Sequence, residues 1–453
     1  MADETANGHQ YSPGITRIAV TGFKSLTEKT EVEIRPLTVL AGANSSGKSS
    51  LMQPLLLMKQ TLESDFVPAG PFKLSGPYTN YTESKQFLSS VELVGNSCQR
   101  LAIDFEIGGQ TTAGFAFAVD PNGLFAVDET RGSRFGVNAP TSWAIRHDSS
   151  AAEIHTLDFP WDLSGSTKGL FDYHAERYRF YLRIKASKSS DASDPQSQSY
   201  EFLETIRLNN EIRRLIFVPG LRGDQLRRWL LTEVSSTNAF EGPFESYVPS
   251  IIEYWQQTNP RVSPSISELN AALKLLGLAS SVRTLRLNES QIEMRVPRTL
   301  TSDENDSVNV ADVGLAVSTV LPVLVALIQA EPGQLVYIDQ PDLHLHPSAQ
   351  VLIAQMLANA ANRGVRLVIE THSSLLLQGI LTCVAKGSIT PEKVALHWFA
   401  RDEEGVTSVT TADIDAEGRF GDWPSDFDDV ELKATNDYLD AMETKLMASK
   451  GSA

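Results

Sequence analysis

The stretch Gly42-Ala43-Asn44-Ser45-Ser46-Gly47-Lys48-Ser49 decides the fold, because it has the spacing Gly-x-x-x-x-Gly-Lys-Ser of a phosphate-binding loop. Its glycines permit a turn that a Cβ atom would block, so successive backbone N–H groups can surround a phosphate. Residues 37–40 before it are predicted to form a strand, and residues 49–53 to begin a helix. This order directs the positive end of the helix dipole at the anion. The alternative is a chance match of a Gly/Ser/Lys-rich turn, and the strand, loop and helix context argues against it.

The side chains of this loop have separate expected roles. Lys48 is expected to reach the β- and γ-phosphates of a nucleotide, and the Ser49 hydroxyl to bind Mg²⁺. The other nucleotide-binding residues predicted from the loop are Gly42, Asn44, Ser45, Ser46, Gly47 and Ser50.

Two later apolar stretches each end in polar residues. Residues 334–338 are typical of a strand buried on both faces of a parallel sheet, and Asp339 follows at its carboxyl end, where ligands of open α/β sheets bind. Asp339 is expected to complete the Mg²⁺ shell through water, or else to cap the next segment. Residues 365–369 repeat the pattern before Glu370-Thr371-His372. His372 is expected to hydrogen-bond a γ-phosphate or the attacking water, although a lone histidine is more often structural.

Three further stretches carry a family resemblance. Residues 338–347 (Ile-Asp-Gln-Pro-Asp-Leu-His-Leu-His-Pro) look like an extended second nucleotide motif, residues 15–26 like an opening strand with a Phe-Lys pair, and residues 312–318 followed by Leu321-Pro322 like a signature loop. Together they resemble the SMC-like and RecF-like ABC ATPases, a family often described as AAA family ATPases or overcoming-lysogenization-defect-like ATPases. The resemblance implies an α/β fold: a P-loop ABC-type ATPase head with a mixed central sheet, an antiparallel β-subdomain and a short helical insertion.

The resemblance also implies a dimer in which each ATP lies between the phosphate loop of one subunit and the signature loop of the other. Lys48, Ser49, Asp339 and His372 would act in cis. Ser318 would act in trans on the γ-phosphate bound by the partner. Residues 321–328 are predicted to form a helix whose first turn presents N–H groups to an anion, the alternative being an ordinary buried helix.

Two residues depart from the family pattern. Ala316 stands where a second glycine is common, which restricts the backbone if that position needs positive φ. Gln340 stands where many relatives carry a glutamate that polarises the attacking water. Glutamine cannot accept a proton, and a general base contributes about 10² to 10⁴ in rate, so slow hydrolysis is expected. Three explanations for Gln340 are open. It is a trait of a natural subgroup, its missing base is compensated by Asp342 or His372, or it is a deliberate substitution that traps bound ATP. We favour the first, with Asp342 and His372 as candidates to assist.

Arg222 is a further candidate ligand of the nucleotide. It ends a Pro-x-x-Arg run, residues 219–222, that resembles an element of these ATPases. Its planar guanidinium suits phosphate or carboxylate, and a surface salt bridge is an equal alternative.

The bulk composition favours a cytoplasmic protein that does not bind nucleic acid over its whole surface. The 453 residues carry a formal net charge of -17, which repels nucleic acid, although a local basic groove is an alternative to a solvated face. That groove would contain Arg213, Arg214, Arg222, Arg227 and Arg228. The only cysteines, Cys98 and Cys383, lack metal-binding spacing, and residues 1–8 do not resemble a signal peptide. No stretch approaches the roughly twenty apolar residues of a membrane span.

The expected organisation has four parts. They are an N-terminal ATPase lobe with phosphate loop and β-subdomain (1–224), a helical insertion serving as lid or short arm (225–281), a C-terminal ATPase lobe with signature loop, second nucleotide motif and His switch (282–383), and a C-terminal cap (384–453). Alternating runs between residues 72 and 183 predict antiparallel strands. Residues 398–410 are predicted to form a strand pair. Residues 421–428 resemble a Trp-Pro-x-x-Phe element that ends one ATPase subgroup. We expect this element to be an acidic turn, with a metal site as the alternative. The chain past His372 is too short for an appended nuclease domain.

The expected function is that of a homodimeric or higher-order ATPase with ATP and Mg²⁺ as cofactors. The sequence shows no recognisable nuclease or other effector domain. We therefore expect a separate effector protein encoded nearby, such as a nuclease or a toxin. By resemblance alone, the setting is prokaryotic antiphage defence with the ATPase as sensor and scaffold. The alternatives are a RecF/SMC-like DNA-binding repair or recombination ATPase and a subunit that binds ATP without hydrolysing it.

Overall fold

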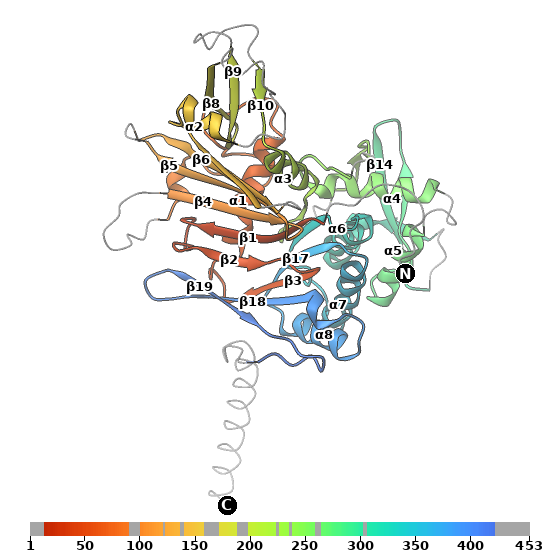
Figure 1. Ribbon diagram of the computed structural model, residues 1–453. Helices are drawn as coiled ribbons and strands as arrows, with labels where there is room; N and C mark the ends of the chain where they lie inside the picture. The colour runs from red at the N-terminus through yellow and green to blue at the C-terminus, as the bar shows by residue number, and fades with distance from the viewer. Residues whose placement is uncertain are drawn as a thin grey trace, which may run out of the picture.

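The computed structural model describes residues 13–89, 100–120, 123–135, 140–157, 172–187, 198–222, 226–234, 238–258, 264–301 and 306–421. Within these ranges the chain forms eight α-helices and four β-sheets (Figure 1). None of the helices in this part of the chain is both long and apolar enough to cross a bilayer. Cys98 and residues 422–453, with most of the Trp-Pro-x-x-Phe element, lie outside the described ranges.

The central sheet brings the ends of the sequence motifs together. Its strand order is β11 (Ile216–Val218), β16 (Leu335–Asp339), β17 (Arg366–Thr371), β3 (Leu37–Gly42), β18 (Val394–Arg401) and β19 (Thr407–Ala412). The first five strands are parallel, and β19 pairs with β18 antiparallel. β17 lies between β16 and β3, and its register places Glu370 beside both Asp339 and Leu40. The carboxyl ends of all three motif strands therefore meet at one edge.

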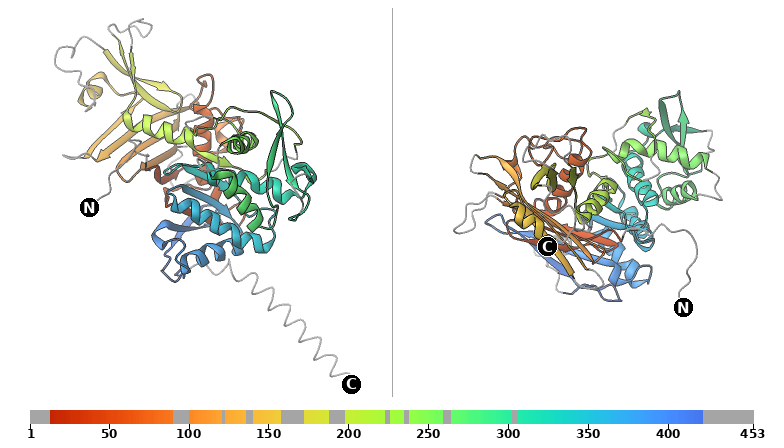
Figure 2. Two further views of the ribbon diagram at one scale, coloured as in Figure 1. Left: turned by 90° about the vertical axis from the view of Figure 1, so that its right-hand side faces the viewer. Right: turned by 45° about the horizontal axis from the view of Figure 1, so that its top comes forward.

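Both faces of this sheet are covered, which explains its continuous apolar strands. Val336 and Ile338 point into a core shared with the helices of one face, whereas Leu335 and Tyr337 point into the other core. The first face is covered by α4 (Val248–Gln257), α5 (Ser265–Leu275), α6 (Leu315–Gln329), α7 (Pro347–Asn362) and α8 (Ser374–Ala385). The second is covered by α1 (Lys48–Leu62), α3 (Leu203–Arg214) and an antiparallel sheet. Figure 2 shows this sheet, in orange, away from the blue helices of the first face.

The antiparallel sheets confirm the β-rich character predicted between residues 72 and 183. The larger one has the order β2 (Thr30–Glu33), β1 (Ile15–Thr21), β4 (Arg100–Ile107), β5 (Thr111–Val119), β6 (Phe125–Phe135) and β7 (Pro140–Arg146). A smaller one has the order β10 (Gln198–Tyr200), β9 (Tyr181–Ser187) and β8 (Asp172–Tyr178), and the short helix α2 (Ala151–Thr156) contacts β8.

The segment predicted to be mostly helical, 225–281, contains α4 and α5 but also a strand. β12 (Trp229–Leu230) joins β13 (Arg283–Arg286), β14 (Gln291–Pro297) and β15 (Ser307–Asn309) in a fourth sheet, and α4 contacts β13 and β14. Helix α4 therefore packs on this small sheet, while α5 packs on α4 and α6.

The signature region differs from its prediction. Helix α6 begins at Leu315 and not at Leu321, so the predicted loop is partly its first turn. The buried residues of α6 recur at helical spacing: Val317, Val320, Leu321 and Leu324. Packing of this apolar face stabilises the helix on both sides of Pro322. Ala316 lies within α6 and has no positive φ, so the alanine causes no backbone strain.

Candidate nucleotide-binding site

The phosphate-binding loop has the backbone shape that its glycines allow. Gly42 has a φ of 143° and Gly47 a φ of 100°, in the region that favours glycine. A Cβ on Gly42 would lie 2.2 Å from the Phe399 carbonyl oxygen, and one on Gly47 2.4 Å from Thr407 Oγ1. Gly47 caps α1 without a side-chain hydrogen bond, so the first-turn N–H groups face the loop and can bind an anion.

Lys48 and Ser46 contain polar groups that a phosphate would satisfy. The Lys48 side chain lies over the loop, where its Nζ donates to the carbonyl oxygens of Gly42 (3.1 Å) and Ala43 (2.7 Å). Burial lowers the pKa of Lys48, against the opposing charges of Glu370 and Asp339. Ser46 Oγ is buried and has no hydrogen-bond partner among the described residues. The loop therefore fits an anionic ligand.

Ser49, Glu370 and Tyr337 form a hydrogen-bonded chain behind the loop. Ser49 Oγ donates to Glu370 Oε2 at 2.8 Å, and the Tyr337 hydroxyl donates to the other oxygen of the same carboxylate. Burial, followed by the charge of Asp339, raises the pKa of Glu370 to about 7. Because Ser49 donates its proton to Glu370, its lone pairs remain for a cation on the loop side.

Asp339 lies at the end of the neighbouring strand. Its carboxylate accepts a hydrogen bond from the Gly220 backbone, and burial raises its pKa. With Ser49 and Glu370 it provides oxygen donors of the type that Mg²⁺ prefers. In the described part of the chain no group of three or more His, Cys, Asp or Glu residues could hold a metal ion alone. This donor set fits Mg²⁺ bound together with phosphate oxygens, because Mg²⁺ commonly takes only one or two protein carboxylates.

The residues after Asp339 are held by their backbone. Gln340 adopts a φ of 50°, and its N–H donates to the Glu370 carbonyl oxygen at 2.9 Å. Asp342 Oδ1 accepts from Thr371 Oγ1 at 2.7 Å, and burial raises the pKa of Asp342. These contacts join the ends of β16 and β17.

His372 follows β17 directly and is exposed. It makes a hydrogen bond to the Gly42 backbone, so it lies beside the phosphate loop as its position after the strand predicted. Partial desolvation of the ring, followed by the charge of Lys48, lowers the pKa of His372. Both effects favour the neutral ring, which donates a hydrogen bond from one nitrogen and accepts one at the other.

Arg222 makes contacts that differ from both sequence interpretations. Its guanidinium donates to the backbone carbonyl oxygens of Thr319, Pro219, Asp339 and Gln340 at 2.7–2.9 Å. Burial lowers its pKa to about 10. The carbonyl contacts join β11, α6 and β16, so in this structure Arg222 positions the Asp339 segment.

Other members of the predicted basic groove are paired with acids. Arg214 forms an ion pair with Glu331 at 2.7 Å, and Arg227 with Asp312 at 2.5 Å.

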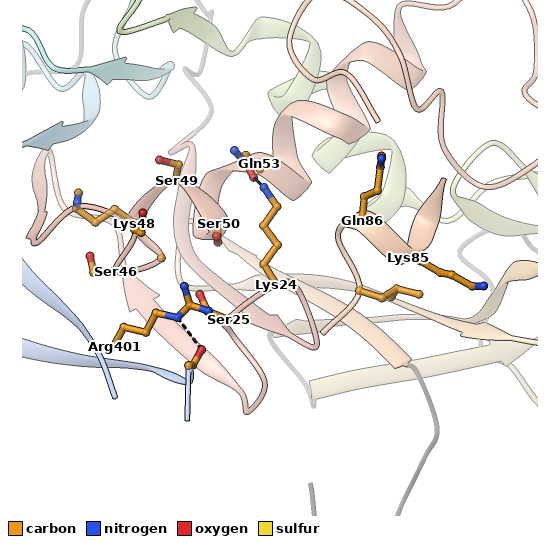
Figure 3. A pocket seen from close by; sticks show the side chains of 14 residues that line it. Lys24, Ser25, Ser46, Lys48, Ser49, Ser50, Gln53, Lys85, Gln86 and Arg401 are labelled. Atoms are coloured by element: carbon orange, nitrogen blue, oxygen red, sulfur yellow. Dashed lines mark hydrogen bonds between the residues drawn. The ribbon is translucent and has the colours of Figure 1, made fainter. Parts of the chain in front are cut away.

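A cavity of about 500 Å³ opens beside the loop (Figure 3). Its lining includes six of the predicted nucleotide-binding residues: Ser45, Ser46, Gly47, Lys48, Ser49 and Ser50. Ser318 lies elsewhere in the chain, lining a separate small cavity, and its Oγ donates to the Leu315 carbonyl oxygen at 2.9 Å. A single chain therefore does not bring Ser318 to the loop.

The sequence left several lining residues without a role. Arg401, Lys85, Gln53 and Gln86 line the cavity, and no motif contains them. Glu370 has no predicted role in its motif, although an acid at the end of a predicted buried strand is a signal of the same kind as Asp339.

Comparisons with solved structures found SMC head domains. They are a SmcHead bound to the C-winged helix domain of ScpA (12% identity, 88% of this chain and 97% of that chain, TM-score 0.48) and the SMC head domain from Thermotoga maritima (11%, 88% and 98%, TM-score 0.37). A third is the Smc head domain with an extended coiled coil bound to the C-terminal domain of ScpA, derived from Pyrococcus furiosus (11%, 88% and 96%, TM-score 0.43). A comparison with curated proteins found no match.

Two family models match the chain. Residues 389–436 match "Protein of unknown function (DUF3696)". Residues 37–378, most of the chain, match the ATPase family described as "AAA domain, putative AbiEii toxin, Type IV TA system". This match confirms the resemblance found in the sequence motifs, and the chain belongs to this AAA-domain family.

Proposed function

We propose that this protein binds Mg-ATP at the loop around Lys48 and hydrolyses it slowly. The observation that supports this is the meeting of three adjacent strand ends: the loop after β3, Asp339 at the end of β16, and Glu370 with His372 at the end of β17. This arrangement brings the Ser49 hydroxyl, two carboxylates and a histidine together around one end of the phosphate loop.

Each side chain has a proposed role in this site. The first-turn amides of α1 and Lys48 bind the phosphates, while Ser49 and Asp339 hold the metal ion. Bound Mg²⁺ would neutralise charge on the β- and γ-phosphates. His372 binds the γ-phosphate or the water, and Gln340 orients the water without accepting its proton. Because Gln340 supplies no general base, hydrolysis is slow. Asp342 and His372 are the proposed groups that assist it.

Nucleotide binding and phosphate release by the wild type and by Lys48→Ala test this proposal. The Lys48→Ala protein should lose ATP binding, whereas Lys29→Ala, which removes an exposed lysine paired with Glu31, should bind as the wild type does. Wild-type protein that binds no ATP would refute the proposal. Tight binding without any phosphate release would instead favour the subunit that uses ATP only as a ligand.

The wider role is proposed as that of a dimeric sensor and scaffold that controls a separate effector in antiphage defence. The family description names a Type IV TA system, and a toxin–antitoxin system has two components, which supports a partner chain. Co-purification of the chain with the products of neighbouring genes tests this role, and a homodimer that brings no other chain would count against it. A DNA-binding ATPase has less support, because Arg222 is engaged by carbonyl groups and Arg214 and Arg227 by acids.

A further inference from the structure

The β18–β19 hairpin packs directly on the phosphate-binding loop. Thr407 Oγ1 donates to the Ser46 carbonyl oxygen at 2.8 Å and lies 2.8 Å from Ser25 Oγ. The Thr407 N–H donates to the Ser25 carbonyl oxygen at 2.8 Å. Because Thr407 is buried, these contacts hold the hairpin against the loop.

The hairpin contributes a cation to the cavity beside the loop. Arg401 lies at the end of β18 and lines the cavity together with Lys24, Lys85 and Lys48. Figure 3 shows the Arg401 guanidinium directed toward Ser25, while Lys85 points away from the other labelled side chains. No carboxylate appears among the lining residues that the structure describes, although the whole chain carries a net charge of -17. The cavity is therefore complementary to an anion.

The proposed hydrolytic groups are not among the described residues that line the cavity. Asp339, Gln340, Asp342 and His372 do not belong to its described lining, whereas Ser25, Ser50 and Gln53 do. If the γ-phosphate faces Asp339 and His372, the α-phosphate and the nucleoside extend into this cavity. Gln53 accepts a hydrogen bond from Lys24 Nζ at 2.6 Å, which fixes the far wall.

We propose that Arg401 binds the α-phosphate of the nucleotide, so that the β18–β19 hairpin forms a wall of the site. The Arg401 Nε donates to the Gly405 carbonyl oxygen at 2.9 Å within the hairpin. This bond orients the guanidinium and uses only Nε, so its terminal amino groups are donors for a phosphate. The inference rests on the proposed binding of ATP and assigns one residue of that site.

Equilibrium binding of ATP and of ADP to the full chain tests the assignment. Arg401→Ala should weaken both affinities about tenfold and by the same factor, because the α-phosphate is common to both nucleotides. Arg401→Lys, which keeps the charge but not the fork, should weaken them less.

Arg419→Ala is the matched control, because Arg419 is exposed in the same C-terminal region and does not line the cavity. Unchanged affinities in Arg401→Ala, a loss for ATP alone, or an equal loss in Arg419→Ala would each overturn the assignment. Each of these outcomes leaves ATP binding by the wild type intact. Wild-type protein that binds neither nucleotide would refute the proposed function itself.

Discussion

Gln340 is fixed by its backbone, so the chemistry of its side chain can be changed without moving it. Its N–H is bonded to the Glu370 carbonyl oxygen and its own carbonyl oxygen to Arg222. Gln340→Glu keeps the side-chain size and adds a proton acceptor beside the attacking water. We expect the rate of hydrolysis at saturating ATP to rise about 10- to 100-fold, with ATP affinity unchanged.

Single-turnover phosphate release and equilibrium ATP binding measure the two quantities separately. Gln340→Ala is the companion variant, because it removes the amide without supplying a base and should not accelerate hydrolysis. An unchanged rate in Gln340→Glu would remove this residue from the mechanism.

Glu370 should make the stability of the nucleotide-free protein depend on pH. Its pKa rises from 4.5 to about 7 on folding, because burial disfavours its charge. Between these values the folded state binds more protons than the unfolded state, so the free energy of unfolding falls as pH rises through this window. The full effect is about 3 kcal/mol.

Glu370→Gln is neutral at every pH and should lack this loss. Urea unfolding at about pH 5 and about pH 8 should show a smaller decrease for the variant than for the wild type. Burial also raises the pKa values of Asp339 and Asp342, and both acids are present in both proteins. The difference between the two pH profiles therefore reports Glu370 together with its electrostatic interaction with Asp339. Parallel pH profiles for the two proteins would show that Glu370 is not responsible.

At the scale of residues, the sequence predicts best where chemistry and spacing coincide. Lys48 and Ser49 follow from a local motif, and the structure places them in the predicted loop. The position of Glu370 beside Asp339 and the phosphate loop depends on the pairing of β17 between β16 and β3. No local sequence pattern predicts this pairing. The contacts of Arg222 are with carbonyl groups from distant segments. Its residue type and the Pro-x-x-Arg run therefore predicted only a ligand of phosphate or a surface salt bridge.

At the scale of elements, the approach of the β11 loop to the end of β16 is a close packing contact. A Cβ on Gly220 would lie 2.7 Å from Asp339 Oδ2, nearer than van der Waals contact allows. Gly220→Ala should therefore displace the Asp339 carboxylate. We expect hydrolysis to fall about 10- to 100-fold, because small displacements of positioned groups have effects of this size.

The Mg²⁺ concentration for half-maximal activity should rise in the same variant, since Asp339 is proposed to help hold the ion. Gly70→Ala is the control, because a Cβ there meets nothing within 4 Å. Activity of Gly220→Ala equal to that of Gly70→Ala would show that this contact does not position Asp339.

The same scale explains which elements the sequence predicted. Strands buried on both faces, such as β16 and β17, show as continuous apolar runs, and the structure confirms them. The start of α6 was placed too late because Leu321-Pro322 resembles a helix beginning, where proline is favoured. The burial of Val317 and Val320 against neighbouring elements extends the helix to Leu315, and this burial depends on the tertiary fold.

At the scale of the whole molecule, one chain contains every residue proposed to act in cis. Its signature helix, the first turn of α6 with Ser318, lines a different cavity from the phosphate loop. Leu315 is exposed and Ser318 half-buried at the start of α6, and Leu221, beside Arg222, is 95% exposed. A second copy that covers this region would bring Ser318 to the phosphate loop of its partner, as the family geometry implies. Each nucleotide would then need the loop of one chain and the signature helix of the other.

Mixing two inactive variants distinguishes this trans arrangement from one in which Ser318 acts within its own chain. Lys48→Ala and Ser318→Arg should each abolish hydrolysis when alone. In a mixed dimer, the intact loop of the Ser318→Arg chain faces the intact signature helix of the Lys48→Ala chain, so one of the two sites is complete. Half of the dimers in an equal mixture are mixed and have one working site, so activity should return to roughly a quarter of wild type. A cis arrangement leaves no complete site in any dimer, and a mixture that stays inactive despite demonstrated subunit exchange would contradict the trans role of Ser318.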